Sequence, residues 1–171
     1  LKVQEQNAPS NCQHVGSLQK KLVSLFLILG LSLCLLISIN RSFQVDEIEN
    51  IHAAFNMHQG LLLYKDFWQG HNPLLYYLLY PVIRPSDPVF SFLAVRCVMV
   101  ILLLGTIWFS FLYAKSQWGI WYGLSACFLL LFNSTFIERG IEARADIAMA
   151  FCQMLALWLE TRIRDRRNRY V

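Results

Sequence analysis

Charged side chains are scarce in this chain. Asp, Glu, Lys and Arg make up 15% of its 171 residues, and 56% of the residues are hydrophobic, whereas an average soluble domain is about 25% charged and about 45–50% apolar. This balance excludes intrinsic disorder and argues against a globule surrounded by water. The length corresponds to about one domain. Because the chain begins at Leu1 without a Met and ends within an arginine-rich run, we expect it to be a fragment of a longer protein.

Metal-binding and nucleotide-binding fingerprints are also missing. The five cysteines are widely spaced and include no C-x-x-C pair, so neither a zinc site nor a disulfide framework is predicted. Four of the five lie inside apolar runs, where a thiol behaves as a small hydrophobic group. The chain contains no glycine-rich phosphate-binding loop, so nothing in it indicates an enzyme that binds a nucleotide.

Long apolar runs are what the sequence does contain. Residues 22–39 are eighteen residues without a charge, which as a helix reach about 27 Å, close to the hydrocarbon thickness of a bilayer. A secretory signal peptide is the alternative, but its apolar region is typically about 7–15 residues and ends in a small-x-small cleavage site. Further runs predict spans over about 89–114, 118–133 and 145–161. The predicted fold class is therefore an all-α integral membrane protein with about four transmembrane helices.

The positions of Lys and Arg predict how these spans are oriented. Basic residues precede the first span, lie between the second and third, and follow the fourth, so the positive-inside rule puts residues 1–21 and 162–171 in the cytoplasm. The basic excess is then an anchor on the inner side of the membrane, and no nucleic-acid partner is expected. Residues 22–161 form the membrane domain, with residues 40–88 as its first external loop. Eight of the eleven acids fall on the external side: Asp46, Glu47, Glu49, Asp66, Asp87, Glu138, Glu142 and Asp146.

The first external loop contains two segments that we expect to be helices at the membrane surface. One begins at Asp46, a suitable N-cap, and ends at Gly60, a suitable C-terminal cap. Residues at helical spacing form its apolar face: Ile48, Ile51 and Phe55. The other covers residues 73–83, which is too short to span a bilayer; if it did span, every later segment would be inverted. Its tyrosines, which we expect at headgroup level, are Tyr76, Tyr77 and Tyr80.

Arg96 is a charge inside the second predicted span, close to its start. An ionisable residue within a membrane helix is by default a candidate for function. So near the end of a helix, however, a long side chain can also extend to the lipid headgroups. The sequence leaves both interpretations open.

Four short motifs follow the first span in a defined order. They are Asp46-Glu47, the G-x-x-x-Y-x-D stretch with Gly60, Tyr64 and Asp66, the H-x-P motif His71-Asn72-Pro73, and the R-x-D motif Arg144-Ala145-Asp146. Each motif alone is weak, but their joint order resembles the GT-C membrane glycosyltransferases, in particular the bacterial branch with the protein O-mannosyltransferases and the aminoarabinose transferase that acts on lipid A. The resemblance extends over about residues 22–161 and concerns the N-terminal part of these enzymes.

The resemblance implies a transferase that moves a sugar from a polyprenyl-phosphate carrier in the lipid bilayer to a hydroxyl of a glycan, lipid or protein acceptor. Such chemistry needs a base for the acceptor hydroxyl and a cation for the departing phosphate. The resemblance makes Asp46 the catalytic base and Glu47 the neighbour that orients it. Donor or lipid-phosphate binding falls to Arg96, Arg144 and Asp146. The loop motif, with acceptor contacts, is made of Tyr64, Asp66 and His71.

The sequence leaves alternatives for the use of a metal ion, for the cellular membrane and for the functional class of the protein. Some GT-C relatives use a divalent cation and others need none; if one is used, Asp46 and Asp146 would hold Mg or Mn through oxygen ligands.

We expect a bacterial inner membrane with the active site facing the periplasm, and the endoplasmic reticulum is the alternative. A catalytically inactive membrane scaffold or partner subunit is the second functional hypothesis. A transporter is the third, although no predicted span is broken by Gly or Pro at mid-depth.

Overall fold

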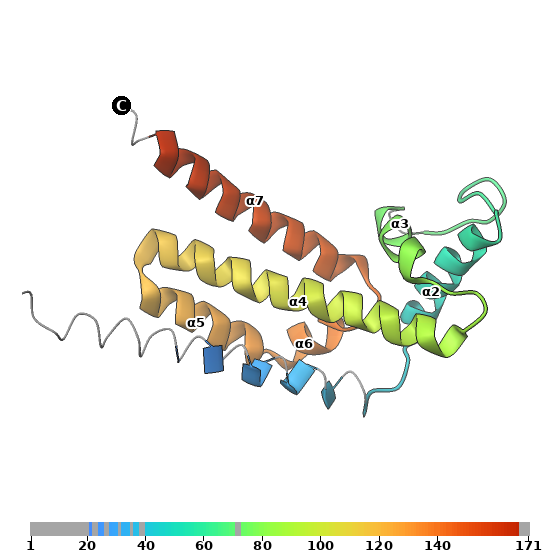
Figure 1. Ribbon diagram of the computed structural model, residues 1–171, viewed down its shortest axis with the longest axis horizontal. Coiled ribbons are helices and arrows are strands. Elements are labelled where there is room, and N and C mark those ends of the chain that lie inside the picture. The colour runs from blue at the N-terminus through green and yellow to red at the C-terminus, as the bar shows by residue number, and fades with distance from the viewer. Residues whose placement is uncertain are drawn as a thin grey trace, which may run out of the picture.

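The computed structural model describes residues 21, 24, 25, 28–30, 32–34, 36, 37, 40–70 and 73–167. Over these residues the protein is all-helical and contains no β-strand. The elements are α2 (Val45–His58), α3 (Leu74–Leu79), the 3-10 turn η1 (Tyr80–Val82), α4 (Pro88–Trp118), α5 (Ile120–Leu131), α6 (Ser134–Gly140) and α7 (Ala145–Arg167) (Figure 1). The predicted all-α class is therefore confirmed for the described part of the chain.

The central element is α4, whose 31 residues reach about 46 Å at 1.5 Å per residue. Asp87 caps it by accepting a hydrogen bond from the amide of Phe90 at 2.9 Å, and Pro88 occupies the first turn, where a missing N–H costs nothing. Among the described residues, α4 is the one helix long and apolar enough to cross a membrane by itself.

The helix that contains the second predicted span, about residues 89–114, extends beyond the predicted end of that span. The helix continues through Trp118, and the turn is made by Gly119 alone, with φ 102°. None of residues 115–118 breaks a helix, whereas a left-handed φ favours glycine because it has no Cβ. The change of direction therefore falls where the backbone requires glycine.

The third predicted span, residues 118–133, contains α5 and the residues that flank it. α5 has 12 residues, which reach only about 18 Å, and α6 follows at an angle of 71°. Asn133 starts the new helix by accepting a hydrogen bond from the amide of Phe136 at 3.0 Å. The pair α5–α6 can count as one broken span or a re-entrant loop.

The fourth predicted span lies in α7, and the first is described only in part. α7 begins at Ala145, as expected, but runs past residue 161 to Arg167. The helix is long enough to span, but its charged C-terminal turns lower its apolar character. Of residues 22–39, those that the structure describes are helical, and the others lie outside the described residues, as do residues 1–20. The count of four spans stays a prediction.

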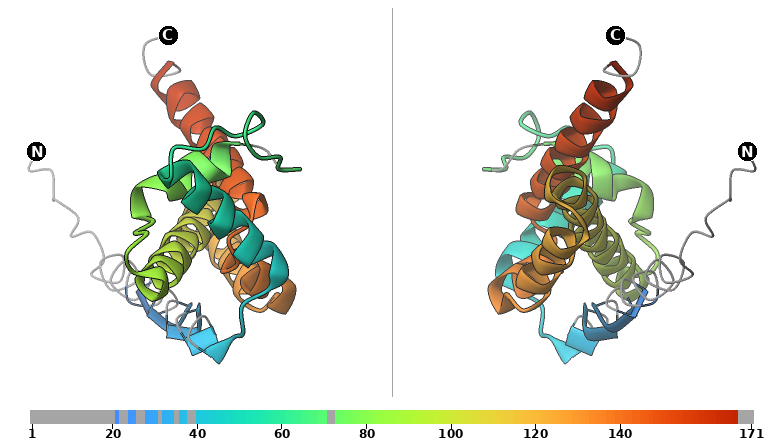
Figure 2. Two further views of the ribbon diagram at one scale, coloured as in Figure 1. Left: turned by 90° about the vertical axis from the view of Figure 1, so that its right-hand side faces the viewer. Right: turned by 90° about the vertical axis from the view of Figure 1, so that its left-hand side faces the viewer.

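α4 packs between α5 and α7, which touch it on different faces (Figure 1). Side chains spaced four residues apart along α4 form a buried stripe: Val95, Met99, Leu103, Ile107 and Phe111. This spacing is the helical repeat of a core-facing surface. Toward its C-terminal end, α7 diverges from α4 (Figure 2).

Two glycines allow the long helices to approach closely. A Cβ at Gly105 of α4 would lie 2.5 Å from the ring of Phe151 on α7, and a Cβ at Gly123 of α5 would lie 2.9 Å from the ring of Phe111 on α4. Both aromatic rings fill the space that the missing side chains leave. The glycines are therefore packing positions rather than turns.

The predicted surface helix at residues 46–60 is present as α2, with two corrections. It begins at Val45 after Gln44, so Asp46 is in its first turn instead of being the N-cap. Its buried face contains Glu47 and Asn50, whereas Ile48, expected on the apolar face, is 46% exposed. Hydrophobic spacing misplaced this face because it could not foresee that polar side chains have buried partners.

The prediction for Gly60 is confirmed. Its φ is 85°, and it ends α2 in a Schellman arrangement, with the amide of Gly60 bonded to the carbonyl of Met57 at 3.1 Å and the amide of Leu61 bonded to that of Asn56 at 3.2 Å. Such a C-terminus favours glycine in the left-handed position.

The segment predicted as a helix over residues 73–83 is α3 followed by η1. Tyr77 and Tyr80 are exposed, as expected for side chains at headgroup level. Tyr76 was expected there too, but it has no exposed surface. Its hydroxyl donates a hydrogen bond to the side-chain oxygen of Asn50 at 3.2 Å, so Tyr76 anchors α3 to α2.

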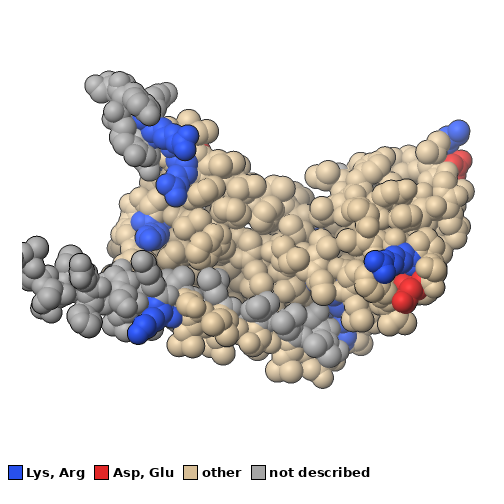
Figure 3. All heavy atoms as spheres, in the orientation of Figure 1, with Lys and Arg blue, Asp and Glu red and all other residues tan. Residues whose placement is uncertain are grey.

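The face drawn in Figure 3 shows how charges are distributed over the two ends of the molecule. On this face basic side chains lie at the end where α4 turns into α5 and where α7 ends, and the acids lie at the opposite end, beside basic residues. Glu160, near the end of α7, is also exposed.

Candidate functional site at the start of α2 and α7

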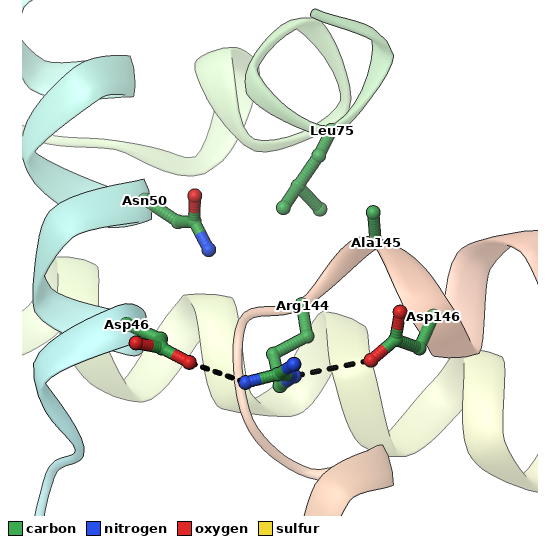
Figure 4. A pocket seen from close by; sticks show the side chains of 6 residues that line it. All are labelled: Asp46, Asn50, Leu75, Arg144, Ala145 and Asp146. Carbon is green, nitrogen blue, oxygen red and sulfur yellow. Dashed lines mark hydrogen bonds and ion pairs between the residues drawn. The ribbon is translucent and has the colours of Figure 1, made fainter. Parts of the chain in front are cut away.

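Asp46, Arg144 and Asp146 form a cluster of alternating charge. Arg144 immediately precedes α7, and its guanidinium donates hydrogen bonds to Asp46 of α2 and to Asp146 of α7, the latter at 3.1 Å (Figure 4). The carboxylate side chains are 54% and 67% exposed, and Arg144 is 27% exposed. Two predicted motifs, 98 residues apart, thus meet at the surface.

The electrostatic surroundings keep Arg144 charged. Its hydrogen bond to Asp146, reinforced by the negative charges of Asp146 and Asp46, raises the pKa of Arg144 above its ordinary value, although partial burial acts in the opposite direction. Asp146 also lies in the first turn of α7, where a carboxylate is stabilised by the helix dipole. The cluster therefore offers two solvent-accessible carboxylates around a permanent cation.

A small pocket opens at this cluster. It is lined by Asp46, Asn50, Leu75, Arg144, Ala145 and Asp146 (Figure 4). Its volume of about 40 Å³ has room for only a few water molecules. A larger apolar groove of about 510 Å³ lies beside it, between α3, α4 and α7, and shares Leu75 and Ala145 with the polar pocket. The polar pocket and the apolar groove are thus contiguous.

Glu47 and Arg96 form a buried pair behind the cluster. The guanidinium of Arg96 binds both carboxylate oxygens of Glu47, at 3.0 and 2.9 Å, and Glu47 has no exposed surface. Arg96 also donates to the carbonyls of Arg41 and Ser42, at 2.9 and 3.3 Å, and stacks on the ring of Phe43 at 4.0 Å. The pair therefore fixes the segment that leads into α2.

These contacts revise the sequence-based view of both residues. Arg96 is buried against protein atoms and does not line the pocket, so this conformation offers it neither to a lipid phosphate nor to the headgroups. Glu47 lies in the first turn of α2, directly after Asp46, and does not line the pocket either. Its predicted role of orienting Asp46 stays a prediction.

A second buried acid was missed by the sequence analysis as a site component. Glu142 is 1% exposed and pairs with Arg41 at 2.9 Å and with Arg139 at 3.3 Å. Glu138 also pairs with Arg41, at 3.3 Å. Asn50 was missed as well, although its position one helical turn after Asp46 is a signal that the two side chains share a face.

The loop motif residues stand apart from the pocket. Tyr64 has φ 64°, an uncommon conformation for a residue with a side chain, and its ring lies 5.4 Å from that of Trp68. Asp66 accepts a hydrogen bond from the amide of Leu62 at 2.8 Å. Neither Tyr64 nor Asp66 lines the pocket, and His71 lies outside the described residues.

The cluster does not fit a divalent cation in this conformation. The guanidinium of Arg144 occupies the position between Asp46 and Asp146, where a metal held by both would have to sit. In the part of the chain that the structure describes, no group of three or more His, Cys, Asp or Glu side chains could hold a metal ion. The arrangement is instead suited to accept a proton at a carboxylate and to bind an anion at an arginine.

No protein-family model, no curated protein and no solved structure matches this chain. Any functional assignment therefore depends on the residues of the cluster and on their order in the sequence.

Proposed function

We propose that the protein is the N-terminal part of a GT-C-type glycosyltransferase, which moves a sugar from a polyprenyl-phosphate carrier to an acceptor hydroxyl. One observation supports this above all: Asp46 and the Arg144-Ala145-Asp146 motif line the same pocket. The two motifs come from different loops of the sequence, and a shared site is what the resemblance requires. The adjoining apolar groove is of the kind that a lipid carrier needs.

In the proposed reaction Asp46 is the general base. Its carboxylate accepts the proton of the acceptor hydroxyl, whose oxygen forms a bond to the anomeric carbon of the sugar. The bond between that carbon and the carrier phosphate breaks, and its electron pair stays on the phosphate oxygen. Arg144 stabilises the departing phosphate, since a guanidinium binds phosphate with two parallel hydrogen bonds. Because Arg144 is bound by two exposed carboxylates, a phosphate oxygen can replace one of them.

The finer topology belongs to the same proposal. The proposal includes four spans, cytoplasmic ends at residues 1–21 and 162–171, and a site on the outer face of a bacterial inner membrane. Basic side chains at the end of the molecule opposite the charged cluster support it. A lipid carrier would then reach the pocket by diffusing within the bilayer. Its chain would lie along the groove between α3, α4 and α7.

A transfer assay in membranes tests this function. Membranes that contain the complete protein are incubated with labelled polyprenyl-phosphate sugars, and both labelled product and released polyprenyl phosphate are measured. Asp46→Asn should lower the turnover about 10²–10⁴-fold, the usual contribution of a general base, with normal expression. Glu49→Gln is the matched control, since Glu49 is an exposed acid of the same helix that does not line the pocket.

The alternative is a scaffold or partner subunit without catalysis. The observation that favours it is the pairing itself, because an arginine held by two carboxylates can also join α2 to α7 for stability. Absence of transfer with every donor, together with lower stability of Asp46→Asn, would support the scaffold. Solute uptake without sugar transfer would instead indicate a transporter.

A further inference from the structure

Asn50 lines the pocket and connects three segments that meet there. It lies on α2, one turn after Asp46, and is 3% exposed. Its amide nitrogen donates a hydrogen bond to the carbonyl of Ala143 at 2.8 Å, and its amide oxygen accepts one from the hydroxyl of Tyr76 at 3.2 Å. A carbonyl can only accept, so the partner at Ala143 determines which end of the amide faces it.

The bond to Ala143 bears directly on Arg144. Ala143 is the preceding residue, and the amide of Arg144 is itself bonded to the carbonyl of Glu142 at 2.7 Å. The backbone from which Arg144 extends is thus held at two adjacent points. The same helix carries Asp46, which binds the guanidinium, and Asn50, which holds the backbone behind it (Figure 4).

The ion pairs of Arg144 cannot set its position alone. They are partly exposed, and exposed pairs contribute little because water competes for both charges. The bond from Asn50 to Ala143 is buried, and a buried carbonyl that loses its donor is not compensated by water. The relative position of Asp46 and Arg144 therefore depends more on Asn50 than on their mutual attraction.

We propose that Asn50 is a positioning residue that holds Arg144 opposite Asp46. Its effect on turnover rests on the proposed glycosyltransferase function, whereas its effect on the distance between α2 and α7 does not. Burial, and after it Tyr64 and Glu49, raise the pKa of Tyr76, so its hydroxyl stays protonated and donates to Asn50. This bond holds α3 and does not act on the backbone at Arg144.

The test compares two substitutions that each remove one bond of Asn50. Asn50→Asp keeps the shape and can still accept from Tyr76, but it cannot donate to Ala143 when ionised. Tyr76→Phe removes the other bond and leaves the one to Ala143. Because a buried carboxylate can prevent folding, Asn50→Leu provides a neutral variant of similar size that also lacks the donor.

Distance measurements give a readout that is independent of catalysis. Nitroxide labels are placed at the exposed positions Val45 and Met149 in the complete protein with its cysteines replaced, and the distance distribution is recorded by pulsed electron paramagnetic resonance. We expect a broader distribution in Asn50→Asp and Asn50→Leu, and an unchanged one in Tyr76→Phe. Unchanged distributions in both Asn50 variants would overturn the proposal.

Transfer kinetics provide the second readout. A displacement of about 1 Å at a reacting group can cost about 10²-fold, so kcat should fall about 10- to 100-fold in Asn50→Leu, with KM for the lipid donor changed less than about twofold. Tyr76→Phe should stay within about twofold in kcat. Broadened distances with no transfer by the unmodified protein would refute the glycosyltransferase and leave the positioning role intact. A loss confined to KM would contradict the role assigned to Asn50.

Discussion

The two ends of the α4–α7 pair use arginine in opposite ways. At the end formed by α2 and the start of α7, four arginines pair with carboxylates, and Arg84 stacks on the ring of Phe90 at 4.1 Å. The four are Arg41, Arg96, Arg139 and Arg144. At the other end, Arg162 stacks on Trp158 at 5.3 Å, and Arg164 donates to Gln117 at 3.2 Å. Within the described part of the chain, no ion pair includes Arg162 or Arg164.

Burial accounts for this difference. A guanidinium that leaves water must be compensated by a charge and by hydrogen bonds, as Arg96 is by Glu47 and by two backbone carbonyls. An exposed guanidinium keeps its water and needs no partner. The buried Arg96 is therefore held by partners within the protein, whereas Arg162 and Arg164 are exposed and have only a ring and an amide as neighbours. The following predictions test that contrast, in decreasing order of effect.

The largest effect is expected at the buried pair. Arg96→Leu should lower the free energy of unfolding by about 3–5 kcal/mol, because Glu47 is left buried without a counter-charge. Denaturation by sodium dodecyl sulfate in micelles, followed by circular dichroism, measures this loss. Adding Glu47→Leu to the same protein should recover part of it; a double variant no more stable than Arg96→Leu would contradict the pairing as its cause.

Substitution of Arg144 should lower activity strongly and stability only slightly. Arg144→Gln removes the cation beside Asp46, and kcat for transfer should fall about 10²–10³-fold, the effect of losing one donor to a developing anion. The free energy of unfolding should fall by less than about 1 kcal/mol, because its ion pairs are partly exposed. Arg144→Lys keeps the charge but not the planar fork and should recover only part of the turnover. Equal activity in all three proteins would exclude Arg144 from the site.

The contact between α4 and α7 has an intermediate effect. Gly105→Val forces a side chain against the ring of Phe151, whose nearest atom would lie 2.5 Å from the new Cβ. Overpacking of this kind costs about 1–3 kcal/mol, and the midpoint of denaturation should fall accordingly. Gly70→Ala is the control, since nothing lies within 4 Å of a Cβ there. The same loss in both variants would exclude helix packing as the cause.

The smallest effect is expected at the second end. Arg164→Gln should change the free energy of unfolding by no more than about 0.5 kcal/mol, as for other exposed substitutions. Its only described polar partner is Gln117, which water can replace. A loss comparable to that of Arg96→Leu would show that the two ends do not differ in the way proposed.

Local signals in the sequence predicted much of the fold. The apolar run of α4, the start of α7 and the glycine end of α2 depend on the residues nearest to them, and all three were correctly foreseen. The helix α6 was not foreseen, because the polar residues Asn133, Ser134 and Thr135 mark only the end of the apolar run and were expected to begin an external segment. The hydrogen bond from the amide of Phe136 to the side chain of Asn133 starts this helix.

The candidate site, like the fold, was predicted only in part. Motif order predicted that Asp46 and Arg144 belong together, and the fold brings them into contact. Burial of Glu47 and Asn50 could not be predicted, because helical periodicity assigns polar residues to the exposed face unless a partner is known. Their partners, Arg96 and Ala143, lie 49 and 93 residues further along the chain.

By itself, the sequence determined that the described chain is helical and apolar, since hydrophobic content and glycine conformation act over a few residues. Only the tertiary structure decided which acids are buried and which are presented to solvent. Adjacent residues Asp46 and Glu47 point to different partners, because successive side chains on a helix are about 100° apart. Which of those directions faces the core depends on how α2 packs against α4.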